Sequence, residues 1–141
     1  MNAKEFLSQA YRLDLRINSK IEQIAALNDL AHKATSVVTG LPHSPNKGKS
    51  AMADTVDKIV DLQREINADI DTLVDLKAEI VNVIKAIDNK EYQTILEKRY
   101  LCFMTWESIA VDMGYSIQHL YRLRERAYRE VVVPAKYDRK C

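Results

Sequence analysis

The stretch of sequence that decides the fold reads TWESIAVDMGYSIQHLYRLRERA and occupies residues 105–127. Thr105 and Ser116 each stand directly before an apolar periodic run, where a hydroxyl can accept hydrogen bonds from the first backbone amides of a helix. Gly114 lies between the two runs and can adopt the positive φ that a tight turn requires. The pattern therefore predicts two helices joined by a short turn, with Pro134 closing the second.

The second of these helices has two distinct sides. At ~100° per residue, Leu120, Leu123 and Ala127 share one side, and we expect Ile109 and Met113 of the first helix to pack there. The opposite side carries Gln118, Tyr121, Arg122, Glu125 and Arg129, with His119 and Arg126 beside them. In the major groove arginine pairs with guanine and glutamine pairs with adenine. The pattern predicts a helix-turn-helix whose second helix can read DNA.

A further helix is expected just upstream, over residues 91–101. Asp88 and Glu91 have the spacing of a capping box, which places the start of this helix between them. A short break follows at 102–104, where we expect Cys102 to be a small buried apolar group. Trp106 comes next, and we favour a packing role for it over base stacking. Residues 89–133 are thus expected to form a three-helix module, and residues 134–141 a short basic tail.

The N-terminal residues 1–88 contain two long runs in which apolar residues recur every three or four positions. Asn2 and Glu5 form a capping-box pattern at the start of the first run. Two prolines predict a loop at about residues 38–51. The runs predict a long antiparallel, coiled-coil-like hairpin, which can close within one chain or exchange between two. We expect the hairpin to support homo-oligomer formation.

The composition of the whole chain predicts an all-α fold. Its 141 residues include 3 Gly and 3 Pro, whereas β and α/β folds need frequent turns. Its 2 Cys and 3 His form neither a disulfide framework nor a ligand set, and no constellation supplies an activated nucleophile or an acid–base pair. We therefore expect no catalytic residue, no metal and no cofactor. With no apolar run near ~18 residues and no signal-peptide pattern, we expect a cytoplasmic protein without a membrane partner.

The formal net charge of +1 hides an uneven distribution. Both ends of the chain are basic and the middle is acidic. Residues 116–141 carry seven basic and three acidic side chains. Such a segment can face an anionic partner, although arginines near the end of a helix also complement the helix dipole.

The segment from Ile95 to Arg129 resembles region four of bacterial sigma factors. The resemblance is carried by the pair Arg99 and Tyr100, followed by a pattern made of Thr105, Glu107, Ile109, Ala110, Met113, Gly114 and Ser116. Over its full length the chain is similar to small phage and prophage proteins of Gram-positive bacteria, often described as sigma-like or ArpU-type late-gene regulators. The resemblance implies recognition of double-stranded promoter DNA, with RNA polymerase as a further partner.

The same resemblance assigns roles to individual residues. It implies base reading by Gln118, Tyr121 and Arg122, and places Thr105, Ser116 and Arg126 nearer phosphates. From their positions on the helix we add Glu125 to the expected base-reading residues, and His119 and Arg129 to those expected at phosphates or flanking groups. A long hairpin stands where a sigma factor has its promoter-melting regions. We therefore expect an accessory transcription regulator, encoded by a phage or prophage and acting in the bacterial host cell.

Two other functions fit the same pattern. Small terminase subunits also combine a helix-turn-helix with helical hairpins, which assemble into rings for DNA packaging. A protein-only adaptor that binds RNA polymerase without binding DNA is the other alternative.

Overall fold

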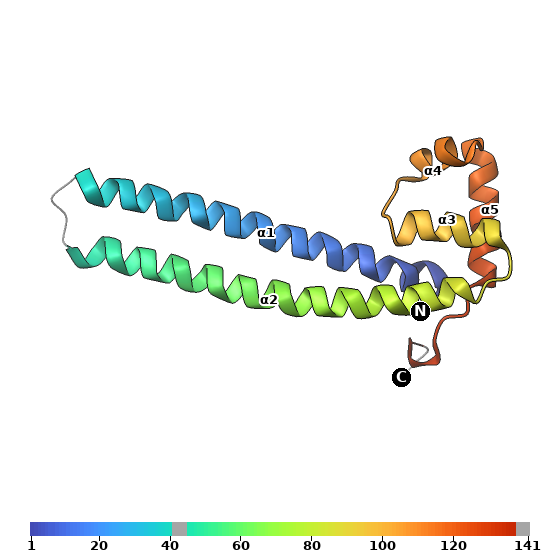
Figure 1. Ribbon diagram of the computed structural model, residues 1–141, viewed down its shortest axis with the longest axis horizontal. Helices are drawn as coiled ribbons and strands as arrows, with labels where there is room; N and C mark the ends of the chain where they lie inside the picture. Colours follow the sequence, from blue (N-terminus) through green and yellow to red (C-terminus); the bar gives the residue numbers. More distant parts are fainter. Residues whose placement is uncertain (41–44, 138–141) are drawn as a thin grey trace. The chain divides into compact units, whose positions relative to one another are not determined.

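The structure is a computed structural model that describes residues 1–40 and 45–137, with side chains described over 1–33 and 51–137. All regular elements in this part of the chain are helices, which confirms the all-α prediction (Figure 1). In chain order they are α1 (Ala3–Gly40), α2 (Pro45–Lys85), α3 (Lys90–Tyr100), α4 (Trp106–Met113), α5 (Ile117–Glu130) and the short 3₁₀ helix η1 (Ala135–Tyr137).

The chain divides into two compact units. One consists of Met1–Leu13 with Leu73–Cys141, and the other of Asp14–Thr72. The predicted boundary near residue 88 falls inside the first of these units, because the start of α1 and the end of α2 share a core with the C-terminal helices. That core contains Phe6, Leu7, Ala10, Ile80, Ile84, Ile87, Leu96, Tyr100 and Ala127.

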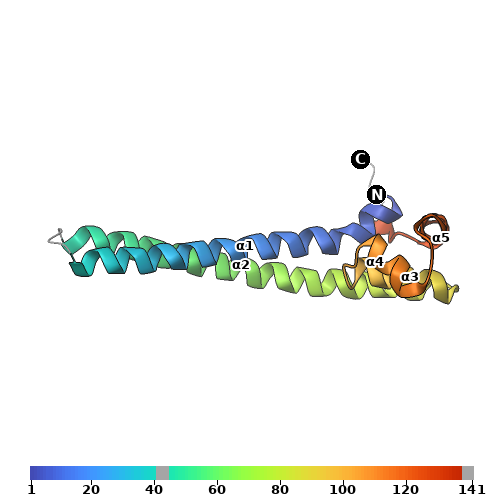
Figure 2. The ribbon, with the colours of Figure 1, turned by 90° about the horizontal axis from the view of Figure 1, so that it is seen from above.

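Within Asp14–Thr72, α1 and α2 run side by side in opposite directions (Figure 1, Figure 2). Ile17 and Ile66 are buried between them. The Lys20 ammonium lies 2.6 Å from a carboxylate oxygen of Asp69. Because a slip of one helix along the other would leave these half-buried charges unpaired, the ion pair favours a single register.

The start of α1 agrees with the prediction from the sequence, whereas the start of α2 differs from it. The predicted capping box of α1 is confirmed, since the amide of Glu5 donates to Asn2 Oδ1 at 2.8 Å and the amide of Asn2 donates to Glu5 Oε2 at 3.2 Å. The predicted loop at 38–51 is wrong in its extent. α1 continues to Gly40 and α2 already begins at Pro45, because proline is well tolerated in the first turn of a helix. Residues 41–44 of that loop lie outside the described residues.

The start of α3 is set by a different residue from the predicted one. Asn89 rather than Asp88 is the N-cap, and its Oδ1 accepts from the amides of Glu91 at 2.9 Å and Tyr92 at 3.2 Å. The side-chain nitrogen Nε2 of the buried Gln93 donates to the backbone carbonyl of Ile87. This bond satisfies a carbonyl just after the end of α2 and ties the two helices together.

The caps and the turn around α4 are as predicted. Thr105 Oγ1 accepts from the amide of Ser108 at 3.1 Å, and Ser116 Oγ accepts from the amide of His119 at 3.2 Å. Gly114 ends α4 with φ of 73°, in the left-handed region. α4 and α5 then close over a second core together with α3, made of Ile95, Ile109, Ala110, Leu120 and Leu123, with Met113 packed against it.

Gly114→Ala is expected to destabilise the protein by about 1 kcal/mol, because an L-residue in the left-handed region is strained. A Cβ at this position would meet nothing within 4 Å, so the cost comes from the backbone and not from a clash. Urea unfolding measures it. Gly114→Asn is the control and should lose less, since asparagine tolerates this conformation. Equal stability of Gly114→Ala and the unmodified protein would contradict the prediction.

The described part of the basic tail is held against its own unit. Lys136 Nζ lies 2.7 Å from a carboxylate oxygen of Glu79 on α2, and the hydroxyl of Tyr137 donates to the same carboxylate at 3.1 Å. The Tyr137 ring packs on Phe6 with ring centroids 5.2 Å apart. Residues 138–141 of the predicted tail lie outside the described residues.

Candidate nucleic-acid interface

The outward side of α5 consists of the residues that the sequence selected. Leu120, Leu123 and Ala127 are buried, so this side of the helix is fixed against the two cores. Four of the predicted site residues are exposed opposite it, and Tyr121 is half-buried: the exposed ones are Gln118, Arg122, Glu125 and Arg129. The predicted orientation of α5 is therefore confirmed, while the roles of these residues on DNA remain predictions.

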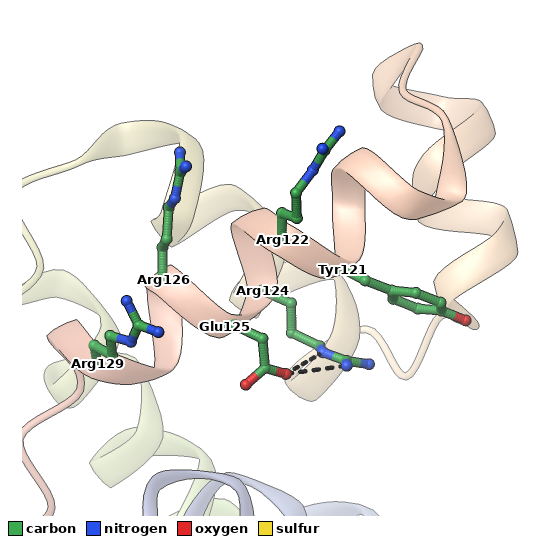
Figure 3. A pocket seen from close by; sticks show the side chains of 6 residues that line it. All are labelled: Tyr121, Arg122, Arg124, Glu125, Arg126 and Arg129. Carbon is green, nitrogen blue, oxygen red and sulfur yellow. Dashed lines mark hydrogen bonds and ion pairs between the residues drawn. The ribbon is translucent and has the colours of Figure 1, made fainter.

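A basic hollow of about 440 Å³ lies along α5 (Figure 3). Arg122 and Arg126, one turn apart, project from the helix in the same direction (Figure 3). The residues that line the hollow are Tyr121, Arg122, Arg124, Glu125, Arg126 and Arg129. Four guanidinium groups thus stand against one carboxylate, and the field in the hollow attracts anions.

Arg124 is a residue of this hollow that the sequence reasoning did not assign to the site. Its guanidinium lies 4.6 Å from the ring centroid of Tyr121 and 5.2 Å from that of Trp106. The spacing of three residues between Tyr121 and Arg124 was the available signal, since residues i and i+3 are neighbours on a helix surface. Arg99 lies against the same indole, at 5.0 Å, so Trp106 supports two arginines and has the predicted packing role.

Glu125 is paired and not free. Its Oε1 accepts from Arg124 Nε at 3.1 Å and lies 3.0 Å from Arg124 Nη2, and Figure 3 shows the two side chains turned toward each other. The pairing offsets the one negative charge in the hollow. The second carboxylate oxygen, Oε2, is not part of this pair.

The predicted flank residues lie at the starts of α4 and α5. Thr105 and Ser116 are exposed and use their hydroxyl oxygens as helix caps. The half-buried His119 ring packs edge-on against Tyr115, with centroids 5.0 Å apart. Arg126, which was also predicted to contact phosphate, is exposed within the hollow.

A second hollow of about 410 Å³ adjoins the first through shared residues of α5. It is lined by Asn2, Ala3, Lys4, Arg124, Glu125, Tyr128 and Arg129. Lys4 thereby extends the basic surface onto the start of α1. No local pattern in the sequence connects Lys4 to Arg129, because the proximity is created by tertiary packing.

A pair of tyrosines holds α5 to α3 beneath this surface. The hydroxyl groups of Tyr100 and Tyr128 are hydrogen-bonded to each other. Burial raises the pKa of Tyr100 above the ordinary tyrosine value, with the bond to Tyr128 adding to the effect. Burial also raises the pKa of Tyr128. Both rings are therefore uncharged at neutral pH and act as structural contacts.

Two further findings concern other kinds of site. In the described ranges, no group of three or more His, Cys, Asp or Glu is placed to hold a metal ion, and no helix there is both long and apolar enough to cross a membrane. The prediction that Cys102 is buried is wrong, because its side chain is exposed. The neighbouring Phe103, at φ of 57°, packs on Tyr11 and Lys77. Its side chain, and not that of Cys102, lies against the core.

Comparison with known protein families gives one match. The family described as "Protein of unknown function (DUF1492)" matches residues 45–132, more than half of the chain, from the start of α2 through α5. This family is known in phage proteins. No curated protein and no solved structure matches the chain.

Proposed function

The chain belongs to the DUF1492 family, and we propose that it is a phage-type, sequence-specific DNA-binding transcription regulator. In this proposal α4, the Gly114 turn and α5 form a helix-turn-helix, and α5 enters the major groove. The observation that carries the proposal is the outward side of α5, where the basic hollow presents four arginines around Tyr121.

The residues of α5 divide into two roles. Gln118 and Arg122 lie in the first turns, on the exposed side, and recognition helices contact base edges mainly through their N-terminal residues. Arg126 and Arg129 lie one and two turns later and contact phosphates, joined by Lys4 from the adjoining hollow. Arg124 keeps Glu125 paired, so the arginines meet the phosphate backbone with little opposing charge.

The sigma-factor resemblance supports action at promoters. Arg99, one of its motif residues, has a structural role here: its Nη1 donates to the carbonyl of Met104 at 3.0 Å and its guanidinium lies against Trp106. The motif thus fixes the turn before α4. We propose that the protein regulates transcription beside host RNA polymerase, as an accessory factor.

The test is selection of bound sequences from a random duplex pool at near-physiological salt. The unmodified protein should enrich a motif, and Gln118→Ala with Arg122→Ala should lose it, because the two side chains that supply base-edge hydrogen bonds are gone. The matched control removes a glutamine and an arginine elsewhere, by Gln23→Ala with Arg16→Ala, and should keep the motif.

The outcomes separate the candidate functions. A motif enriched by the unmodified protein and lost only in the α5 variant supports the regulator. Salt-sensitive DNA binding without any motif, by an assembly with the mass of a ring, would favour a packaging component. No binding at low salt, together with capture of RNA polymerase in the absence of DNA, would overturn the proposal in favour of a protein adaptor.

A further inference from the structure

The unit Asp14–Thr72 leaves several large apolar side chains in water. Only Ile17 and Ile66 among its described side chains are buried apolar residues. Ile21 is 49% exposed, Val56 48%, Val60 36% and Ile70 41%. A two-helix hairpin has a thin core, and these four side chains lie outside it.

These four side chains share one side of the hairpin. The other exposed large apolar side chains described in this unit, Leu15, Leu30 and Met52, do not lie on that side. The core positions of α1 are 17, 20, 24 and 27, and those of α2 are 59, 62, 66 and 69, as burial and the Lys20–Asp69 pair show. Ile21, Val60 and Ile70 each stand one residue after one of these core positions, and Val56 stands one residue after Thr55, the preceding core position of α2. One residue corresponds to a rotation of about 100° around the helix axis. In antiparallel helices this rotation leads both helices to the same side. Ile21 and Ile70 directly follow the paired Lys20 and Asp69, so they also lie at the same level.

The opposite side confirms this geometry. Residues that stand one position before core positions line a common hollow of about 460 Å³. They are Gln23 and Ala26 from α1 and Lys58, Asp61 and Glu65 from α2. In both helices, therefore, the residues just before the core positions lie on one side of the hairpin. The residues just after the core positions must lie on the other side.

The two sides differ in charge. The side with the hollow carries Lys58, Asp61 and Glu65. The other side, which we name the uncharged face, contains the following positions over residues 18–28 and 56–70. Its apolar members are Ile21, Ala25, Val56, Val60 and Ile70, and its polar members are the amides Asn18, Asn28, Gln63 and Asn67.

We propose that the uncharged face binds the same face of a second copy of this chain, forming a dimer in which four helices share one core. A two-fold interface must be complementary to itself. A face without charge meets this condition, because no like charges are brought together, whereas it offers nothing to nucleic acid or to a charged protein surface. Gln63 and Asn67 also meet it, since each side-chain amide both donates and accepts and can pair with an amide of the other copy.

The size of the face can be compared with that of known interfaces. Over residues 18–28 and 56–70 the face is ~16 to 22 Å long and two helix diameters of ~10 Å wide, which gives a flat area of ~300 to 450 Å². Side chains corrugate a helical surface, so its accessible area is larger than this flat figure. Stable specific interfaces bury ~800 Å² on each partner, so the uncharged face supplies about half of such an area and forms the centre of the proposed interface.

The test measures the mass of the full chain in solution without DNA, by light scattering and sedimentation, so it is independent of the proposed regulator function. The expected mass is that of two chains of 16.2 kDa. Ile21→Lys with Val60→Lys is expected to raise the dissociation constant of the dimer ~100-fold or more, because each interface then buries four ammonium groups at its apolar centre. Lysine favours helix more than isoleucine or valine does, so the hairpin keeps its helices.

A matched control adds the same charges on the other side. Ala26→Lys with Leu30→Lys should leave the dimer intact. Leu30 is as exposed as Ile21, at 55%, but it stands one position before Ala31, the next core position of α1, and so lies on the side with the hollow. A monomeric unmodified protein overturns the proposal whatever the variants do. A larger assembly, or equal weakening by both double variants, overturns it as well.

Discussion

Replacing Arg122 and Arg126 together with alanine is expected to weaken DNA binding by ~30-fold or more at near-physiological salt. The two side chains point the same way from the basic hollow (Figure 3), so both face whatever anion occupies it. Arginine bound to a base edge or a phosphate contributes ~1 to 3 kcal/mol. Both residues are exposed, so the stability of the protein should change little.

The salt dependence of the same variant separates the two roles. Each phosphate contact contributes about 0.9 to the slope of log affinity against log salt. Loss of one phosphate contact, at Arg126, should therefore lower the slope by about 1, while loss of Arg122 should reduce the preference for one sequence over another. Fluorescence anisotropy over a range of salt concentrations measures both quantities.

The control for this experiment removes the same charge from a different unit. Arg16 and Arg64 are exposed in Asp14–Thr72, and Arg16→Ala with Arg64→Ala lowers the net charge by the same two units. This variant should bind DNA nearly as tightly as the unmodified protein. If both double variants lose equal affinity, binding depends on net charge alone and α5 is not the interface.

The features of the interface that could be predicted are those governed by neighbours in sequence. Thr105 and Ser116 cap their helices because a hydroxyl reaches an amide three residues ahead, whatever surrounds them. Gly114 takes a positive φ at the one place between two apolar runs where a turn is needed. The outward side of α5 followed from the spacing of Leu120 and Leu123, since the buried side of a helix defines the exposed one.

The features that could not be predicted depend on competition between neighbouring residues for the same role, or on contacts between residues far apart in the sequence. Asp88 and Asn89 both offer a side-chain oxygen near the same amides, and the structure uses Asn89. Pro45 reads as a helix breaker in sequence but starts α2, because the absence of an amide hydrogen has no consequence in a first turn. Lys4 reaches the surface of α5 only because the start of α1 packs within the C-terminal unit.

Leu120→Ala is expected to destabilise the C-terminal module by about 3 to 5 kcal/mol. Leu120 is fully buried, and its cluster contains Ile95 from α3 and Ile109 and Ala110 from α4. The three helices meet on this side chain, so its removal leaves a cavity that no single helix can close by shifting. Such a loss is a large part of the ~5 to 15 kcal/mol that stabilises a typical domain. Urea unfolding followed by circular dichroism measures it.

The matched control is an apolar truncation on the surface of the same module. Val111 in α4 is 83% exposed, so Val111→Ala should change stability by no more than about 0.5 kcal/mol. Leu120→Ala should also weaken DNA binding, but only as far as it unfolds the module, and adding stabilising osmolyte should restore affinity. Arg122→Ala with Arg126→Ala should show no such recovery. Equal recovery in both variants would mean that the arginines act by holding the fold and not by contacting DNA.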